Sequence, residues 1–259
     1  MSAGGGFDWP ALEARLAGLT GAVVAYSGGV DSSALLAACA EVLGHARTLA
    51  AIADSPSLGR AELELARSSA AALGVELREL RTAEMEDPRY LANRGDRCYW
   101  CKEALFDAAA PLAAERGWAL LYGENADDDP SDRQGSRSAA ARGVRAPLRE
   151  AGWGKQQVRA YARARGLAAA DKPAMPCLSS RVPVGVEVTA AALGRVESFE
   201  GALRARGYRE LRGRDLADGS VRLELDSAEL PRARAEQAAL EVLAQAHGYR
   251  ALRFGVRGA

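Results

Sequence analysis

The sequence predicts an α/β fold, with a mostly parallel, doubly wound sheet and a small α+β domain after it. Over the first two thirds of the 259 residues, short apolar runs typical of buried strands alternate with Ala/Leu-rich segments of helical length. After Pro183 the order changes to helix, two strands, helix and strand, which is close to a βαββαβ arrangement. We therefore expect one domain at residues 1–182 and a second at 183–259.

The expected elements follow from apolar periodicity and from the Gly and Pro residues between them. Strands are expected at 22–26, 47–53, 75–80, 118–122, 208–215, 221–225 and 249–254. Helices are expected at 10–19, 32–43, 58–73, 102–116, 155–165, 189–206 and 227–247. A long loop is expected at 82–97, and the arginines of the 155–165 helix are expected mostly on a solvated face.

Charge and composition narrow the class of protein. Lys+Arg and Asp+Glu are both 34, so there is no overall basic field that would attract nucleic acid. No apolar run approaches the ~20 residues that span a bilayer, and the first residues lack the apolar core of a signal peptide. We therefore expect a cytoplasmic protein with neither membrane nor nucleic-acid partners. Its four cysteines then indicate metal or redox chemistry more than disulfides.

The segment that follows the first strand has the features of a phosphate site. Two glycines let the backbone turn tightly, and the helix that follows presents unpaired N–H groups and a positive dipole end. Asp31 is placed to hold a Mg²⁺ that bridges phosphate oxygens. An ordinary strand-to-helix turn with capping residues is the alternative. The expected ligand contacts in this segment are Ser27, Gly28, Gly29, Ser32 and Ser33.

Polar residues also follow the second and fourth strands, at the edge of the sheet where ligands of such folds bind. Asp54 and Ser55 are expected to contact a ligand bound there, with a helix cap as the alternative or additional role. Gly123 and Asn125 open an acidic run, 123–129, that suits Mg²⁺ or a ribose. A solvated turn is the alternative for that run.

Three of the cysteines raise a separate question. Cys98 and Cys101 are separated by two residues and are expected just before a helix, which lowers the pKa of a thiol. A thioredoxin-type pair would follow the first strand of its fold, and these two follow the third. A structural zinc site needs a fourth ligand. With Cys177, three thiolates can hold a four-iron–four-sulfur cluster and leave one iron open. The spacing of the cysteines alone favours neither a zinc site nor an iron–sulfur cluster over the other.

Several motifs carry a family resemblance. Residues 27–32, Ser-Gly-Gly-Val-Asp-Ser, resemble the SGGxDS signature of the PP-loop ATP pyrophosphatases, which split ATP between the α and β phosphates. A more specific set resembles the ATP-dependent sulfur transferases that make the nickel-pincer nucleotide cofactor of lactate racemase. That set comprises residues 27–32, 54–57, 96–102, 123–128, 171–181 and 211–214.

The resemblance implies a reaction and a site. Members adenylate a carboxylate of a pyridinium dicarboxylate mononucleotide with ATP and Mg²⁺ and convert it to a thiocarboxylate. Cys177 matches the sulfur-site cysteine. In one branch this cysteine is sacrificed and becomes dehydroalanine; in another, three cysteines hold a cluster that relays sulfide from a donor. Cys98 and Cys101 favour the second branch. The resemblance also implies a homo-oligomer.

Guanidinium groups bind phosphate bidentately, so Arg181, Arg212 and Arg214 are the residues that we expect on the substrate's phosphate. For the last two, a strand with outward charges is the alternative. Three rival functions remain: a cluster-dependent tRNA thiolase, which would need a basic RNA surface; a glutamine-dependent amidotransferase, which would need an ammonia source; and a nucleotide-binding module with structural zinc.

Overall fold

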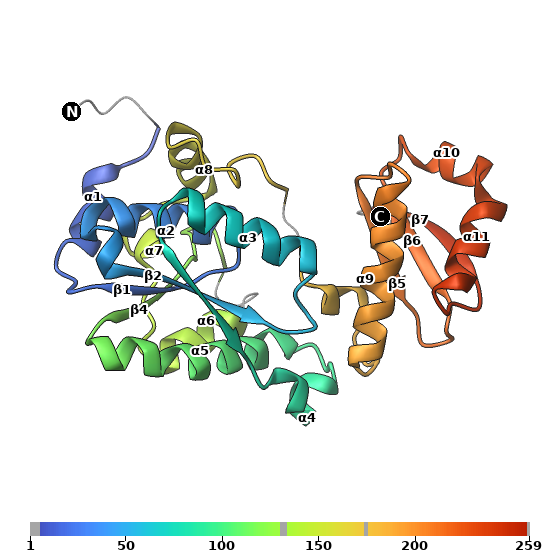
Figure 1. Ribbon diagram of the computed structural model, residues 1–259, viewed down its shortest axis with the longest axis horizontal. Helices are drawn as coiled ribbons and strands as arrows, with labels where there is room; N and C mark the ends of the chain where they lie inside the picture. Colours follow the sequence, from blue (N-terminus) through green and yellow to red (C-terminus); the bar gives the residue numbers. More distant parts are fainter. Residues whose placement is uncertain (1–5, 130–133, 174–175, 258–259) are drawn as a thin grey trace. The chain divides into compact units, whose positions relative to one another are not determined.

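The computed structural model describes residues 6–129, 134–173 and 176–257, which form two compact units (Figure 1). The larger unit comprises Met1–Glu84 and Cys98–Met175, and the smaller comprises Met85–Arg97 and Pro176–Ala259. The smaller unit thus takes up a segment that lies between two parts of the larger one in the sequence. The single boundary after residue 182 stays a prediction, and each unit is described here by itself.

A four-stranded parallel sheet forms the centre of the larger unit, with the strand order β3-β2-β1-β4. Its strands are β1 (Ala22–Ala25), β2 (Thr48–Asp54), β3 (Glu76–Arg81) and β4 (Ala119–Tyr122). All four residues of β1 are buried, as expected for a central strand covered on both faces. The predicted α/β class is confirmed.

Helices cover both faces of this sheet (Figure 1). Val24 of β1 packs in the core beneath one layer, whereas Val23 faces the other layer, because successive side chains of a strand alternate. The first layer contains α1 (Trp9–Leu16), α2 (Val30–Leu43), α3 (Arg60–Ala72), α7 (Pro147–Glu150) and α8 (Lys155–Ala164). The second contains α5 (Arg97–Arg116) and α6 (Gln134–Ala141). No helix in the described part of the chain has both the length and the apolar character needed to cross a membrane.

Two expectations for the segment around the first cysteines are corrected. Helix α5 begins at Arg97, so Cys98 and Cys101 lie inside its first turns and not before it. The expected loop at 82–97 contains a short 3-10 helix, Glu84–Glu86, and α4 (Pro88–Leu91). Helix α4 forms because Asp87 caps it: its carboxylate accepts a hydrogen bond from the Arg89 amide.

The smaller unit has a three-stranded sheet, β5 (Leu211–Asp215), β6 (Val221–Leu225) and β7 (Leu252–Val256). β6 pairs antiparallel with β5 and parallel with β7. Helix α9 (Ala190–Ala205) contributes Phe199 and Leu203 to the core of this unit. The single helix expected at 227–247 is instead two helices, α10 (Leu230–Ala235) and α11 (Gln237–Ala246).

Candidate functional site

The turn between β1 and α2 has the geometry of an anion loop. Gly28 has a φ of +69°, a conformation that residues with a Cβ rarely adopt. The Ser32 hydroxyl accepts a hydrogen bond from the Ser27 amide (3.2 Å) and donates one to the Gly29 carbonyl (3.1 Å). Ser32 therefore holds the turn closed from within.

The start of α2 leaves backbone donors for a ligand. Gly29 is the N-cap residue, and no side chain in the described part of the chain caps this end. The Ser33 amide bonds the Gly29 carbonyl (2.9 Å), so the amides of the first three helical residues, 30–32, have no partner within the helix. Ser33 itself is buried, and its hydroxyl lies 3.4 Å from the Tyr26 hydroxyl, so a ligand contact by its side chain stays a prediction.

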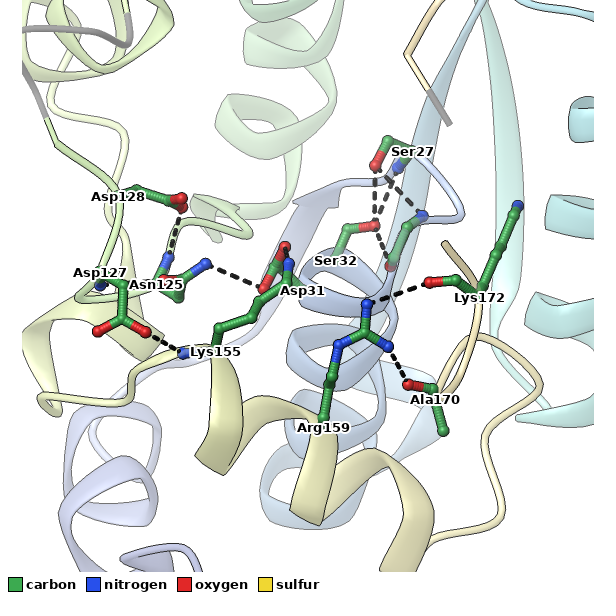
Figure 2. A network of polar contacts seen from close by, with 11 residues as sticks. Ser27, Asp31, Ser32, Asn125, Asp127, Asp128, Lys155, Arg159, Ala170 and Lys172 are labelled. Carbon is green, nitrogen blue, oxygen red and sulfur yellow. Dashed lines mark hydrogen bonds and ion pairs between the residues drawn. The ribbon is translucent and has the colours of Figure 1, made fainter. Parts of the chain in front are cut away.

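Asp31 is the centre of a polar network in the larger unit, which Figure 2 shows. Its Oδ2 lies 2.5 Å from the Lys155 ammonium, and its Oδ1 accepts a hydrogen bond from the Asn125 side chain (3.2 Å). The Asp31 side chain is 16% exposed and that of Lys155 is 39% exposed. The structure thus brings together two predicted residues and one that the sequence did not single out.

The position of Lys155 at the start of α8 is a signal by which sequence analysis could have identified this residue. Lys155 is the first residue of the helix, directly after the N-cap Gly154. A cation there opposes the helix dipole, so a lysine at this position is unfavourable for the helix alone. Such a local cost indicates a role outside the helix.

The acidic run after β4 is a partly exposed turn that also orders the site. Asp127 accepts a hydrogen bond from the Lys155 amide (2.6 Å), which caps α8 from a distant loop. Asp128 accepts one from the Asn125 amide (3.1 Å) (Figure 2). A Cβ on Gly123 would lie 2.6 Å from the Ser32 amide nitrogen, so glycine there lets this loop pass directly against α2.

One turn after Lys155, Arg159 donates hydrogen bonds to the carbonyls of Ala170 and Lys172 (Figure 2). The Lys172 ammonium in turn pairs with Glu62 of α3 (2.5 Å). The interpretation of Arg159 as a solvated surface residue is therefore wrong. It fixes the segment that follows α8.

The residues at the end of β2 and just after it have partners nearby in the sequence, up to the start of α3. Asp54 pairs with Arg60 (2.5 Å), whose guanidinium also donates to the Ser55 carbonyl (2.9 Å). The Ser55 and Ser57 hydroxyls lie 2.8 Å apart. These contacts show a local structural role, and contact with the ATP that the resemblance implies stays a prediction.

In the smaller unit, Cys177 is exposed and lies at the N-terminus of a 3-10 helix, Leu178–Arg181. Arg181 is 2% exposed and forms an ion pair with Glu200 (Nε–Oε1 2.9 Å). Burial raises the pKa of Glu200, but the hydrogen bonds and charge of Arg181 outweigh it and leave that pKa below its ordinary value. Its nearly complete burial in this ion pair sets Arg181 apart from Arg214, whose side chain is 26% exposed.

Arg212 and Arg214 lie on one face of β5 and differ in their partners. Arg214 pairs with Glu224 (3.0 Å) and donates to the Ser180 carbonyl (2.7 Å). The Arg212 side chain forms neither a hydrogen bond nor an ion pair with any described residue, although the backbone of Arg212 pairs with Glu224 in the sheet. Burial, then the charges of Arg181 and Arg214, lowers its pKa from the ordinary value. A partly buried cation without a direct ion pair suits an anionic ligand.

The structure describes all four cysteines, and none of them is in a disulfide. Cys39 is buried in α2, whereas Cys98 and Cys101 are three residues apart on α5 and share a face of that helix. Cys98 and Cys101 belong to the larger unit and Cys177 to the smaller one. Within neither unit do the described residues include a group of three His, Cys, Asp or Glu side chains that could hold a metal. That Cys98, Cys101 and Cys177 hold one cluster stays a prediction.

These features define an α/β protein with an anion loop at the carboxyl end of its sheet. A second unit contains both an exposed cysteine and an arginine without a direct ion pair to a described residue. No family model matches the chain. It is 42% identical to an uncharacterized protein of Synechocystis over 79% of this chain and 76% of that protein. It is 32% identical to the pyridinium-3,5-bisthiocarboxylic acid mononucleotide synthase of Lactiplantibacillus plantarum, over 85% of this chain and 79% of that enzyme. The chain belongs to the family of this synthase.

Proposed function

We propose that the protein is an ATP-dependent sulfur transferase of nickel-pincer cofactor biosynthesis. It adenylates a carboxylate of a pyridinium dicarboxylate mononucleotide and converts that carboxylate to a thiocarboxylate. The observation that carries the proposal is the similarity, over most of both chains, to a synthase named for a pyridinium bisthiocarboxylate mononucleotide. The two sites described above support the proposal, one for each half of such a reaction.

The first half is activation of the carboxylate at the anion loop. The free amides at the start of α2 bind the phosphates of ATP, and the Asp31 carboxylate is the kind of ligand that Mg²⁺ prefers. Lys155 compensates the charge of Asp31 in this structure. On binding of ATP and Mg²⁺, the ammonium turns to the phosphates and stabilises the charge that develops on the leaving pyrophosphate. The substrate carboxylate oxygen attacks the α-phosphorus as the bond to pyrophosphate breaks.

Replacement of Lys155 by methionine is expected to slow pyrophosphate release on the order of 100-fold, because one cation that stabilises the transition state is lost. The measurement is the rate of pyrophosphate release with ATP and substrate in excess. Lys172→Met is the matched control, since Lys172 pairs with Glu62 and not with Asp31. A Lys155→Met rate equal to that of the control would contradict a role for Lys155 in activation.

The second half is sulfur transfer, in which the activated acyl carbon accepts a sulfur nucleophile and AMP leaves. We assign this half to Cys177, whose side chain is exposed. Thiolates are suitable ligands for iron–sulfur clusters, and none of the cysteines is used in a disulfide, so Cys98, Cys101 and Cys177 would hold the proposed four-iron–four-sulfur cluster. The open iron of that cluster would supply sulfide taken from an external donor.

Replacement of Arg212 by alanine is expected to weaken binding of the substrate mononucleotide by about 1.5–3 kcal/mol, the usual contribution of a charge-assisted hydrogen bond. ATP binding should change little, because the anion loop is in the larger unit. Isothermal titration calorimetry with each nucleotide measures the difference. Arg222→Ala is the control, since Arg222 is on the neighbouring strand and pairs with Glu224. Equal losses for both nucleotides would exclude a site specific for the substrate phosphate.

A further inference from the structure

The backbone around Cys177 contacts the guanidinium group of Arg181. Nη1 of Arg181 donates to the Pro176 carbonyl (2.6 Å) and lies 3.3 Å from the Cys177 carbonyl oxygen. The Cys177 carbonyl also accepts a hydrogen bond from the Ser180 amide (2.9 Å). Two successive carbonyls directed at one cation fix the orientation of the peptide between them. The thiol of Cys177 is exposed while its backbone is restrained.

Arg181 is itself fixed by a bidentate contact with a buried carboxylate. Its Nε lies 2.9 Å from Oε1 of Glu200, and its Nη2 lies 3.2 Å from Oε2. The two side chains are 2% and 1% exposed. With the carbonyl contacts of Nη1, all three nitrogens of this guanidinium have partners inside the unit, so Arg181 is a structural clamp in this arrangement.

Glu200 extends the clamp to two further elements. Its Oε1 accepts a hydrogen bond from the Gly213 amide of β5 (3.0 Å), and its Oε2 accepts one from Arg204 of α9 (2.9 Å). A Cβ on Gly213 would lie 3.3 Å from the Phe199 ring, so the strand runs very close to α9 here. The carboxylate therefore connects the packed helix and sheet to the segment that carries the cysteine.

We propose that Arg181 and Glu200 are positioning residues for Cys177, which rests on the proposed function for the role of that cysteine. The pair holds the backbone of Cys177 so that its sulfur has one direction relative to the substrate. Arg181 is itself held by Glu200 and by backbone carbonyls of its own unit. Binding of the substrate anion is left to Arg212, which no described carboxylate pairs with. One arginine therefore positions the cysteine and another binds the phosphate, although the sequence suggests the same role for both.

Hydrogen–deuterium exchange of the ligand-free protein tests this clamp without reference to activity. In Arg181→Lys and Glu200→Gln, exchange in the segment 176–182 is expected to rise roughly tenfold or more, since a charge-assisted contact that restrains it is lost. Exchange in β6, in the core of the same unit, should stay at the wild-type level. Arg204→Lys is the control. Arg204 also contacts Glu200, but its side chain is 40% exposed, so its replacement should leave exchange at 176–182 near the wild-type level. Unchanged exchange at 176–182, or faster exchange throughout β6, would overturn the positioning role.

Steady-state kinetics adds a second readout. Arg181→Lys and Glu200→Gln should lower kcat for thiocarboxylate formation with little change in the KM of the mononucleotide, whereas Arg212→Ala should raise that KM. Arg181→Lys, which keeps one donor, should retain more activity than Arg181→Met. If Arg181→Lys raises the KM of the mononucleotide without lowering kcat, Arg181 binds the substrate phosphate and is not a positioning residue. If the wild-type protein makes no thiocarboxylate, the proposed function fails, whatever the exchange experiment shows.

Discussion

Replacement of Asp31 by alanine is expected to abolish pyrophosphate release. The rate should fall by about two to three orders of magnitude or more, which is the usual effect of removing one essential electrostatic group. The variant loses the proposed Mg²⁺ ligand, and it leaves Lys155 and Asn125 without the carboxylate that they contact. The rate of pyrophosphate release with ATP, Mg²⁺ and substrate is the measurement.

Asp171→Ala is the matched control for this variant. Asp171 is also an aspartate of the larger unit, but its side chain is 75% exposed and pairs with Arg163 at the surface. Its replacement should leave the rate within about twofold of the wild type, since exposed ion pairs contribute little. Asp31→Ala protein that releases pyrophosphate as fast as Asp171→Ala would refute the assignment of the anion loop to ATP.

The second large effect concerns the source of sulfur. Protein purified without oxygen is expected to be brown, to contain iron and sulfide, and to form more than one thiocarboxylate per chain when sulfide is supplied. Cys98→Ser should lose the cluster and repeated turnover together, because a hydroxyl is a poor replacement for a thiolate ligand. Iron and sulfide analysis and product per chain are the measurements. Cys39→Ala is the control, since Cys39 is buried in α2, and it should keep both properties.

Mass spectrometry before and after turnover separates this mechanism from sacrifice of the cysteine. If Cys177 gives up its own sulfur, product stops near one sulfur per chain, the chain loses the mass of hydrogen sulfide, and Cys98→Ser has little effect. Dehydroalanine at position 177 of iron-replete protein would therefore exclude the relay. Zinc without iron would instead support a structural role for the cysteines.

Local pattern predicts much of this fold. The buried run of β1, the glycines after it and the Ala-rich α2 specify a strand, a turn and a helix, and the structure has all three. The expected start of α5 at residue 102 is five residues too late, although Asp96, a residue type that commonly caps helices, directly precedes its first residue. Pattern also gave no sign that the helix expected at 227–247 is divided between α10 and α11.

The candidate site could be predicted only where its residues form one motif. Asp31 was found because it belongs to the turn after β1. Its contact with Lys155 joins residues 124 positions apart, so it depends on how α8 packs and is not visible in either segment alone. Arg181 was assigned to a phosphate from its residue type, whereas its burial against Glu200 is a tertiary property. Residue chemistry thus indicated candidates, and packing determined which groups remain available.

The segment Met85–Arg97 limits how proteins of this kind can be recombined. It belongs to the smaller unit, where the side-chain amide of Asn93 donates to the carbonyls of Pro183 (2.7 Å) and Val186 (3.0 Å). The buried Tyr90 hydroxyl lies 2.6 Å from that of Ser179. A gene fragment cut at one point after the larger unit would omit both partners and leave buried polar groups unsatisfied. The smaller unit is therefore not encoded by one continuous segment, and a single fusion event cannot append or exchange it. Grafting it onto another scaffold requires two discontinuous pieces of sequence.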